Sequence, residues 1–235
     1  MIRVATTQLP ARQYGLKTIR KYLERADARE VDVICFPEGY LNGYTRSEEE
    51  ARERALDVSS DNFKDIMKEL SSFRVMAVIG VIETEENRLF NTAIVVKHGM
   101  LVGKYRKTHP QEGIFEAGVS YPIFEAKGHT FGVNICYDGN FPEATQKLVE
   151  QGAEVVFYPL NNELNKESAE KWRYKHVRNL IARARDTGVI AISSDVIIET
   201  DSTTAYGCTA IVSKDGEVLT KEDELQEGMI LRDIL

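Results

Sequence analysis

Runs of apolar, mostly β-branched residues alternate with amphipathic stretches along the chain. Residues 2–9 (IRVATTQL) and 31–36 (VDVICF) have the pattern of buried strands. Residues 14–30, which lie between them, carry apolar side chains at helical spacing, with one face formed by Leu16, Ile19, Leu23 and Ala26. This alternation predicts an α/β fold.

The middle of the chain continues with two amphipathic helices and then several strands. The helices are predicted over 47–56 and 61–73, with Ser47 and Asp61 as N-caps. A tight hairpin turn is expected at His98–Gly99. The predicted strands cover residues 75–83, 90–97, 100–105, 121–126 and 130–137.

The last part of the chain repeats the earlier rhythm. The pattern predicts a helix over 142–152, a strand over 153–159 and a long helix from about 169 to 186. A strand over 188–195 and a hairpin over 206–219, with its turn at 214–216, are predicted to follow. No linker or low-complexity segment interrupts the pattern, so residues 1–235 are expected to form a single domain. Strands in two sheets with helices outside give a layered α/β sandwich, although this rhythm leaves other α/β architectures open.

Charge and composition narrow the class of protein. A net charge of −7 and a pI near 5.3 argue against nucleic-acid binding, because no basic stripe is available to neutralise phosphates. Three cysteines without a CxxC pair indicate a reduced chain rather than a disulfide framework. The N-terminus lacks a signal-peptide pattern, and no apolar run approaches the roughly 18 residues that span a bilayer. We therefore expect a cytoplasmic protein without membrane contact.

Three reactive side chains each follow an apolar, strand-like run. Glu38 follows VDVICF, Lys107 follows MLVGKY, and Cys136 follows TFGVNI. A reactive side chain just beyond a strand end tends to point into a crevice. A carboxylate, an ammonium and a thiol placed in this way are the parts of a thiol-nucleophile amide hydrolase.

Each of these residues also has an ordinary structural interpretation. A single buried cysteine is usually a small core residue, and a single Glu or Lys at a strand end is usually solvated. In the functional interpretation, Glu38 needs burial or a like charge to raise its pKa so that it can act as the base for the Cys136 thiol. Lys107 would then stabilise the oxyanion of a tetrahedral intermediate.

The combination of motifs is much more specific than any one residue. Four motifs follow one another along the chain: RVATTQLP, FPEGYLNGY, KYRKTHP and CYDGNFPE. Their order is the one found in the nitrilase superfamily of carbon–nitrogen hydrolases, and the chain resembles that family over nearly its whole length. The segments RARDTGVIAI, YGCTAIVSKDGEVL and EGMILRDIL are similar to its closing part. The resemblance implies a four-layer αββα sandwich, often paired into a homodimer.

The resemblance also implies roles for matching residues. Cys136 would be the nucleophile and Glu38 the general base and acid, with Lys107 and the backbone N–H of Tyr137 as oxyanion donors. The family uses a second glutamate after the lysine. Glu112 is the better match for it and Glu116 is the alternative.

A mechanism of this kind needs no metal or organic cofactor. Attack by the thiol on an amide carbonyl would release the amine and leave a thioester, which water would then hydrolyse. The histidines agree with this expectation, because His98, His109, His129 and His176 show no metal-type spacing.

The residues that choose the substrate are less clearly marked. The family builds its pocket from segments that here contain Tyr44, Asn161, Asn162, Glu163 and Trp172, and Tyr44 and Trp172 have an equal claim to be packing aromatics. The DGN after Cys136–Tyr137 resembles amidases and formamidases more than the arginine-bearing carbamoylases and ω-amidases.

These observations predict hydrolysis of a small-molecule amide to an acid and ammonia. One alternative is another branch with the same residues, either an N-carbamoyl amidohydrolase or a nitrilase. A second alternative, of another class, is a non-catalytic family member that binds a ligand or a partner. The intact set of Glu38, Lys107 and Cys136 argues against that second alternative.

Overall fold

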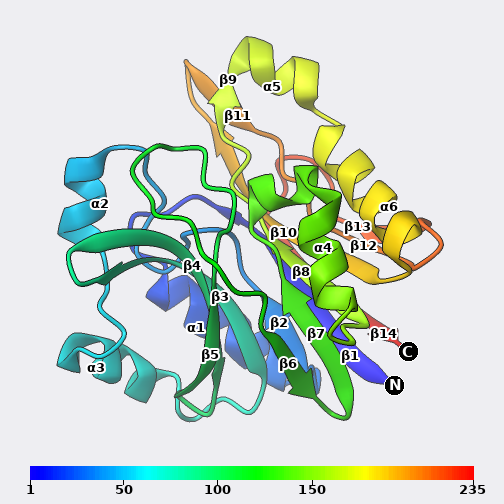
Figure 1. The fold of residues 1–235 in the computed structure, drawn as a ribbon, viewed down its shortest axis with the longest axis horizontal. Helices are drawn as coiled ribbons and strands as arrows, with labels where there is room; N and C mark the ends of the chain where they lie inside the picture. The colour runs from blue at the N-terminus through cyan, green and yellow to red at the C-terminus, as the bar shows by residue number, and fades with distance from the viewer.

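The computed structural model describes residues 1–235, and its strands form a long sheet that is folded into two halves (Figure 1). The strand order is β5-β4-β3-β2-β1-β10-β8-β7-β6. The first half contains β1 (Ile2–Pro10), β2 (Val33–Cys35), β3 (Met76–Glu85), β4 (Arg88–Lys97), β5 (Met100–Arg106) and β14 (Gly228–Ile234). The second half contains β6 (Ile123–Ala126), β7 (His129–Val133), β8 (Val155–Pro159), β10 (Ile190–Glu199), β12 (Ala210–Val212) and β13 (Val218–Lys221).

The two halves are joined only where β1 and β10 pair. This parallel pairing covers Gln8–Pro10 and Asp195–Ile197, at the carboxyl ends of both strands. Away from that junction the halves separate and face each other, and the largest apolar cluster fills the space between them. Its members include Val78 and Val95 from the first half and Phe157 and Ile192 from the second.

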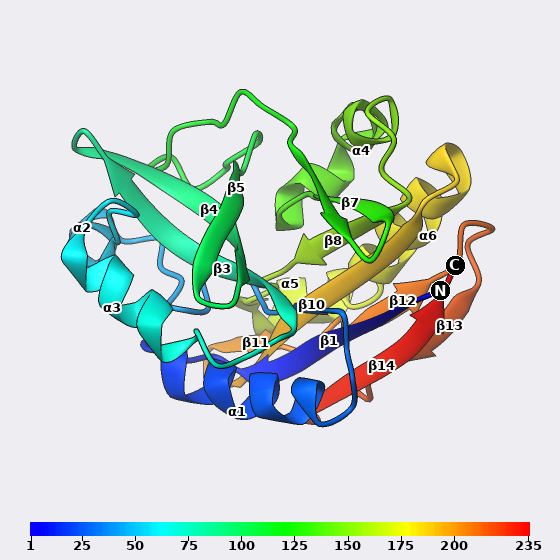
Figure 2. The ribbon, with the colours of Figure 1, turned by 90° about the horizontal axis from the view of Figure 1, so that it is seen from below.

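Helices cover the outer faces of both halves. On the first half, α1 (Leu16–Asp27) and α3 (Asp61–Glu69) bury one apolar stripe each, as expected for amphipathic surface helices. On the second half lie α4 (Pro142–Val149) and α6 (Lys175–Thr187). Figure 2 shows α1 on one side of the molecule and α4 and α6 on the other. The prediction of a four-layer αββα sandwich is therefore confirmed.

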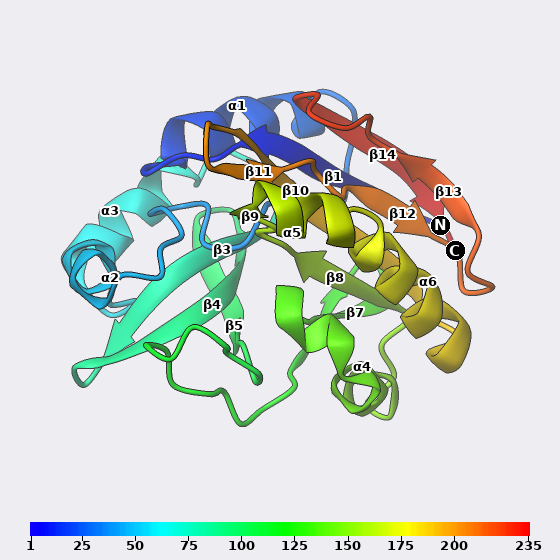
Figure 3. The same cartoon turned by 90° about the horizontal axis from the view of Figure 1, so that it is seen from above.

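A smaller unit extends the second half beyond the sandwich. It consists of β9 (Leu164–Asn165), α5 (Lys166–Trp172) and β11 (Thr203–Ala205), which lie together in Figure 3. α2 (Glu48–Arg54) follows the turn after β2 and lies against β3. β14 pairs with β1 so that Ile234 is opposite Ile2, which brings the two ends of the chain side by side.

Several local predictions were wrong. The long helix expected over 169–186 is interrupted at Arg173–Tyr174, where the Arg173 guanidinium pairs with Glu224. Ser47 caps α2 as predicted, but Ser60 rather than Asp61 caps α3, because the Ser60 hydroxyl accepts from the Phe63 N–H.

The strand expected over 130–137 ends early. β7 stops at Val133, and Cys136 opens the short 3₁₀ helix η1 (Cys136–Asn140) instead. The short strands β9 and β11 had no signal in the sequence pattern. Among the helices, none has the length and apolar character needed to cross a membrane.

Candidate active site

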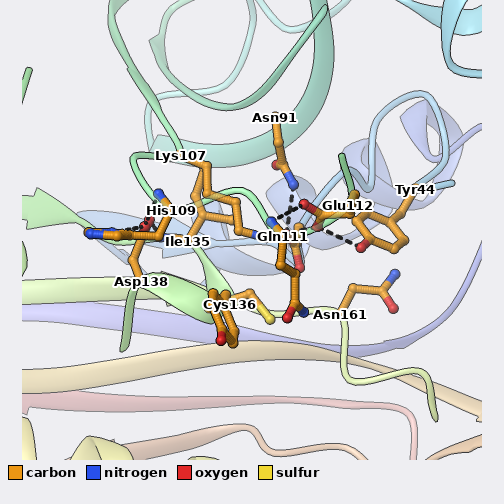
Figure 4. Close-up of polar contacts among 12 residues, drawn as sticks. Tyr44, Asn91, Lys107, His109, Gln111, Glu112, Ile135, Cys136, Asp138 and Asn161 are labelled. Atoms are coloured by element: carbon orange, nitrogen blue, oxygen red, sulfur yellow. Dashed lines mark hydrogen bonds and ion pairs between the residues drawn. The ribbon is translucent and has the colours of Figure 1, made fainter. Parts of the chain in front are cut away.

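Glu38, Lys107 and Cys136 meet at one end of the sandwich, where each follows the carboxyl end of a strand. Figure 4 shows Lys107 and Cys136 there, with Glu112 and Tyr44. Glu38 lies in the turn after β2, Lys107 directly follows β5, and Cys136 begins η1 after β7. The first two strands belong to one half of the sandwich and the third belongs to the other. The site is therefore assembled from both sheet halves.

Glu38 is almost completely buried, with 1% of its side chain exposed. Its Oε1 accepts hydrogen bonds from Lys107 Nζ at 2.8 Å and from Asn91 Nδ2 at 2.7 Å. Its Oε2 is buried and has no partner. Burial raises the pKa of Glu38, and this effect outweighs the opposing charge of Lys107. The carboxylate is thus fixed by one oxygen and has the other free to take a proton.

Lys107 is bound by two carboxylates and is almost completely buried, with 1% of its side chain exposed. Its Nζ donates to Glu38 and, at 2.9 Å, to Oε1 of Glu112, which also accepts from the hydroxyl of Tyr44 at 2.8 Å. Burial lowers the pKa of Lys107, but the negative groups around it raise that pKa well above its usual value. The ammonium therefore stays charged throughout the ordinary pH range.

The structure brings Glu112 rather than Glu116 to Lys107. The Glu116 side chain is exposed, and its backbone N–H donates to the Leu89 carbonyl. The pKa of Glu112 is lowered because Lys107 and Tyr44 together outweigh the effect of burial. Glu112 is therefore an ionised partner of the lysine.

Cys136 occupies a strained position at the first residue of η1. Its φ is +44°, in the left-handed region that non-glycine residues rarely adopt. Burial and the neighbouring Glu38 raise the pKa of the thiol well above its usual value, so the resting group is a neutral thiol. The backbone N–H of Tyr137 follows in the first turn of η1, where it has no acceptor within the protein and faces no competition for an incoming anion.

Asp138 connects the cysteine turn to the lysine segment. One of its oxygens accepts from the Ile135 N–H and the Tyr105 hydroxyl, and the other accepts from the N–H of His109 and the Thr108 hydroxyl. The His109 ring also lies 3.0 Å from this second oxygen. Asp138 is fully buried, so these bonds fix the relative positions of the two loops. His109 is part of this connection.

The glutamate turn rests directly on β3. A Cβ atom at Gly80 would lie 2.3 Å from the Pro37 carbonyl oxygen and 2.4 Å from the Gly39 nitrogen. Only glycine permits this close approach of two backbones. Gly80 thus determines how far Glu38 extends from the sheet.

A cavity of about 260 Å³ opens beside Glu38, although Cys136 and Lys107 are not among the residues that line it. Tyr44 and Asn161 line it, together with Glu163, Arg12 and Arg54 among others. A larger groove, of about 630 Å³, lies around Arg3 and Arg74 near the opposite ends of the strands and contains none of the predicted site residues.

Of the remaining predicted pocket residues, only Asn162 is shown to contact the sulfur. Asn162 Oδ1 is 4.0 Å from Cys136 Sγ. Trp172 is 41% exposed and borders a narrow gap behind Asn162 rather than the cavity beside Glu38. The Tyr137 side chain packs edge-on against Phe141.

Two buried polar neighbours of these residues were missed from the sequence: Asn91, which bonds to Glu38, and Asp195, which bonds to Asn162. Asn91 and Asp195 sit within or at the end of apolar runs, where each was counted as part of a strand. A polar residue that interrupts a buried strand was the available signal, since such residues need a partner. The structure contains no group of three or more His, Cys, Asp and Glu side chains arranged to hold a metal ion.

Comparison with known proteins places the chain among carbon–nitrogen hydrolases. The carbon-nitrogen hydrolase family profile matches residues 3–235. A nitrilase from Pyrococcus abyssi (strain GE5 / Orsay) is 26% identical over 100% of this chain and 90% of its own length. The omega-amidase NIT2 of Xenopus tropicalis is 27% identical over 96% of this chain and 84% of its own.

Solved structures share the fold. The amidase from Nesterenkonia sp. AN1, in which acrylamide has added to the active-site cysteine, has a TM-score of 0.80 at 20% identity and covers 100% of this chain and 94% of that one. Saccharomyces cerevisiae Nit3, of branch 10 of the nitrilase superfamily, has a TM-score of 0.83 at 22% identity, with 98% and 89% covered. Given the family match over residues 3–235, the chain belongs to the carbon-nitrogen hydrolase family.

Proposed function

We propose that this protein hydrolyses a small amide to a carboxylic acid and ammonia through a thioester on Cys136. The observation that carries the proposal is the free oxygen of Glu38. This buried Oε2 has no partner, while the other oxygen is held by Lys107 and Asn91. An unpaired buried carboxylate oxygen is costly to maintain, and a general base at the thiol is a use that accounts for it.

The first half of the reaction forms the thioester. Glu38 accepts the thiol proton as Cys136 Sγ attacks the amide carbonyl carbon, and the carbonyl oxygen becomes an oxyanion. Lys107 and the Tyr137 N–H donate to that oxygen. When the tetrahedral species collapses, the carbon–nitrogen bond breaks, Glu38 returns its proton to the nitrogen, and ammonia leaves.

The second half restores the enzyme. Glu38 removes a proton from water as the water oxygen attacks the thioester carbonyl, again with the oxyanion held by Lys107 and the Tyr137 N–H. Collapse breaks the carbon–sulfur bond, and the sulfur recovers its proton from Glu38. Glu112 acts throughout by holding Lys107 in place, supported by its bond from Tyr44.

The cavity supports a small substrate. Its volume of about 260 Å³ is below the 300–1,000 Å³ typical of pockets for drug-sized ligands. We infer that Tyr44, Asn161 and Asn162 contact the substrate and that residues 1–235 act as one catalytic domain. The homodimer and the cytoplasmic location stay predictions, to be tested by sedimentation and by cell fractionation.

Relatives leave two alternative reactions of the same class, hydrolysis of a nitrile and hydrolysis of an N-carbamoyl group, and the nitrile members of the substrate panel test the first. An N-carbamoylputrescine amidase of Arabidopsis thaliana is 31% identical over 59% of this chain and 52% of its own length. A carbamoyl group is attacked in the same way as an amide, but its hydrolysis releases carbon dioxide as well as ammonia. Carbon dioxide release thus separates carbamoyl hydrolysis from amide hydrolysis.

The test is ammonia release from a panel of small primary amides, ω-amides, N-carbamoyl amines and nitriles. Wild type and Cys136→Ala would be compared, with Cys208→Ala as the matched control because that thiol is 7% exposed against 8% for Cys136. We expect turnover of an amide that is lost in Cys136→Ala and kept in Cys208→Ala. Turnover that survives in Cys136→Ala, or no turnover of any panel member, would contradict the proposal.

A further inference from the structure

Asp195 is a fully buried carboxyl group next to the site that the reaction described above does not use. It lies on β10 at the junction of the two sheet halves, where it is opposite Gln8 of β1. No basic side chain bonds to it. Its oxygens accept instead from Asn162 Nδ2 at 2.6 Å, from the Asn162 backbone N–H at 3.2 Å and from the Val196 backbone N–H at 2.8 Å.

Two of these three bonds come from Asn162, and they determine how its side-chain amide is oriented. An ionised carboxylate only accepts hydrogen bonds, so it selects the NH₂ end of the amide. The other end, Oδ1, is thereby directed to the sulfur of Cys136, 4.0 Å away. The reversed amide would place two acceptors, Oδ1 and the carboxylate, against each other in a buried site.

We propose that Asp195 is a positioning residue for the thiol, and that it acts through Asn162 by keeping an acceptor oxygen rather than an N–H donor beside Cys136 Sγ. This inference rests on the proposed role of Cys136. It adds a member to the site that never touches the reacting atoms. The arrangement extends the site from Cys136 through Asn162 to the sheet junction.

The acceptor has a chemical consequence at the sulfur. An oxygen facing the thiol favours the neutral S–H form, which keeps the proton available for transfer to Glu38 at the moment of attack. An N–H donor in the same place would instead stabilise the thiolate.

The charge state of Asp195 decides how firmly this orientation is held. Burial raises the pKa of Asp195 to about 7, although the bonds from Asn162 and Val196 oppose the shift. Above that pH the carboxylate enforces the orientation, and below it the neutral acid can donate to Oδ1 and permit the reversed amide. The titratable or charged groups that face or border Asp195 are Glu38, Cys136, Arg173, His176, Tyr206 and Cys208.

The test is a double-mutant cycle on Asp195→Asn and Asn162→Ala, followed through alkylation of Cys136 by iodoacetamide at pH 8. Peptide mass mapping separates Cys136 from the other two thiols, and no substrate is needed. We expect Asp195→Asn to speed alkylation about tenfold, equivalent to one pKa unit. Part of that gain comes from removing a negative charge, because Asp195 raises the pKa of the thiol. In the Asn162→Ala background only this charge effect remains, so the gain should be clearly smaller.

Two further readouts distinguish positioning from a structural role. Asp195→Asn should lower kcat while alkylation becomes faster, a combination that general loosening of the fold does not produce. Thr209→Val is the matched control, since it removes the acceptor of the Asp195 backbone N–H and leaves the carboxylate in place. Asn162→Ala alone should also speed the alkylation of Cys136. This single variant tests the proposal if Asp195→Asn does not fold.

Three results would overturn the inference. These are an unchanged alkylation rate in Asp195→Asn, an equal gain in both backgrounds, or the same change in Thr209→Val. Failure of the proposed function looks different, because turnover would then persist in Cys136→Ala or be absent for every member of the substrate panel, whatever the alkylation rates are.

Discussion

Replacing Lys107 with methionine should destabilise the protein by an amount that depends strongly on pH. The change leaves Glu38 and Glu112, each 1% exposed, without the cation that both contact at 2.8 and 2.9 Å. Removing one partner of a buried ion pair costs about 3–5 kcal/mol in the free energy of unfolding. We expect a loss of this size at pH 8.

The pH dependence follows from the protonation of the two carboxyls. Without Lys107 the folded-state pKa values of Glu38 and Glu112 rise above the unfolded value of about 4.3. The folded variant then binds more protons than the unfolded chain, so its stability falls as pH rises, by up to ~1.4 kcal/mol per pH unit for each carboxyl. In the wild type the raised pKa of Glu38 also lowers stability as pH rises, but Lys107 limits that rise in pKa, and the lowered pKa of Glu112 contributes stability above the unfolded value. The difference between the two proteins therefore widens with pH.

Urea unfolding of both proteins at pH 5 and pH 8 measures this difference. We expect Lys107→Met to lose about 1–2 kcal/mol at pH 5 and about 3–5 kcal/mol at pH 8. The double variant Glu38→Gln/Lys107→Met should regain part of the loss at pH 8. The control is Lys64→Met, whose ion pair with Asp61 is largely exposed and is worth about 0–1 kcal/mol. Equal losses at the two pH values would refute the electrostatic reasoning.

Three other substitutions test the site. Because the pKa of Glu38 is raised, kcat/KM of the wild type should fall on acidification at a pH above the usual glutamate range. In a pH–rate series, Glu38→Gln should lack this fall and lower kcat/KM about 10²–10⁴-fold. Asp138→Ala leaves several buried donors without an acceptor and should cost at least ~2 kcal/mol in urea unfolding, with kcat reduced. Gly80→Ala should displace the Pro37 turn and remove most activity, measured beside its thermal unfolding, whereas unchanged kinetics would show that the turn adapts.

The pattern of apolar and polar residues was sufficient to predict an α/β fold, whereas the four-layer arrangement and the roles of the site residues came from the resemblance to the nitrilase superfamily. Apolar runs of strand type locate the sheet, and amphipathic periodicity locates helices such as α1 and α3, because burial of one face determines both patterns. Glu38, Lys107 and Cys136 each lie within three residues of the end of such a strand, and their combination in family-like motifs singled them out.

What could not be predicted depends on contacts between distant segments. The interruption at Arg173–Tyr174 coincides with a pairing to Glu224, which lies 51 positions away. Asn91 reaches Glu38 only because β3 and β4 place it there, and Asp195 reaches Asn162 through the register of β10. Local propensity carries no information on such pairings.

The most direct test of the central claim is the intact mass of the protein during turnover. A substrate found in the amide panel would be mixed with the wild type, quenched in acid within one turnover, and compared with Cys136→Ala. We predict a mass increase equal to the acyl group of the substrate, located on Cys136 by peptide mapping and absent from the variant. Steady ammonia release with no acyl adduct, or an adduct on another residue, would contradict the thioester mechanism.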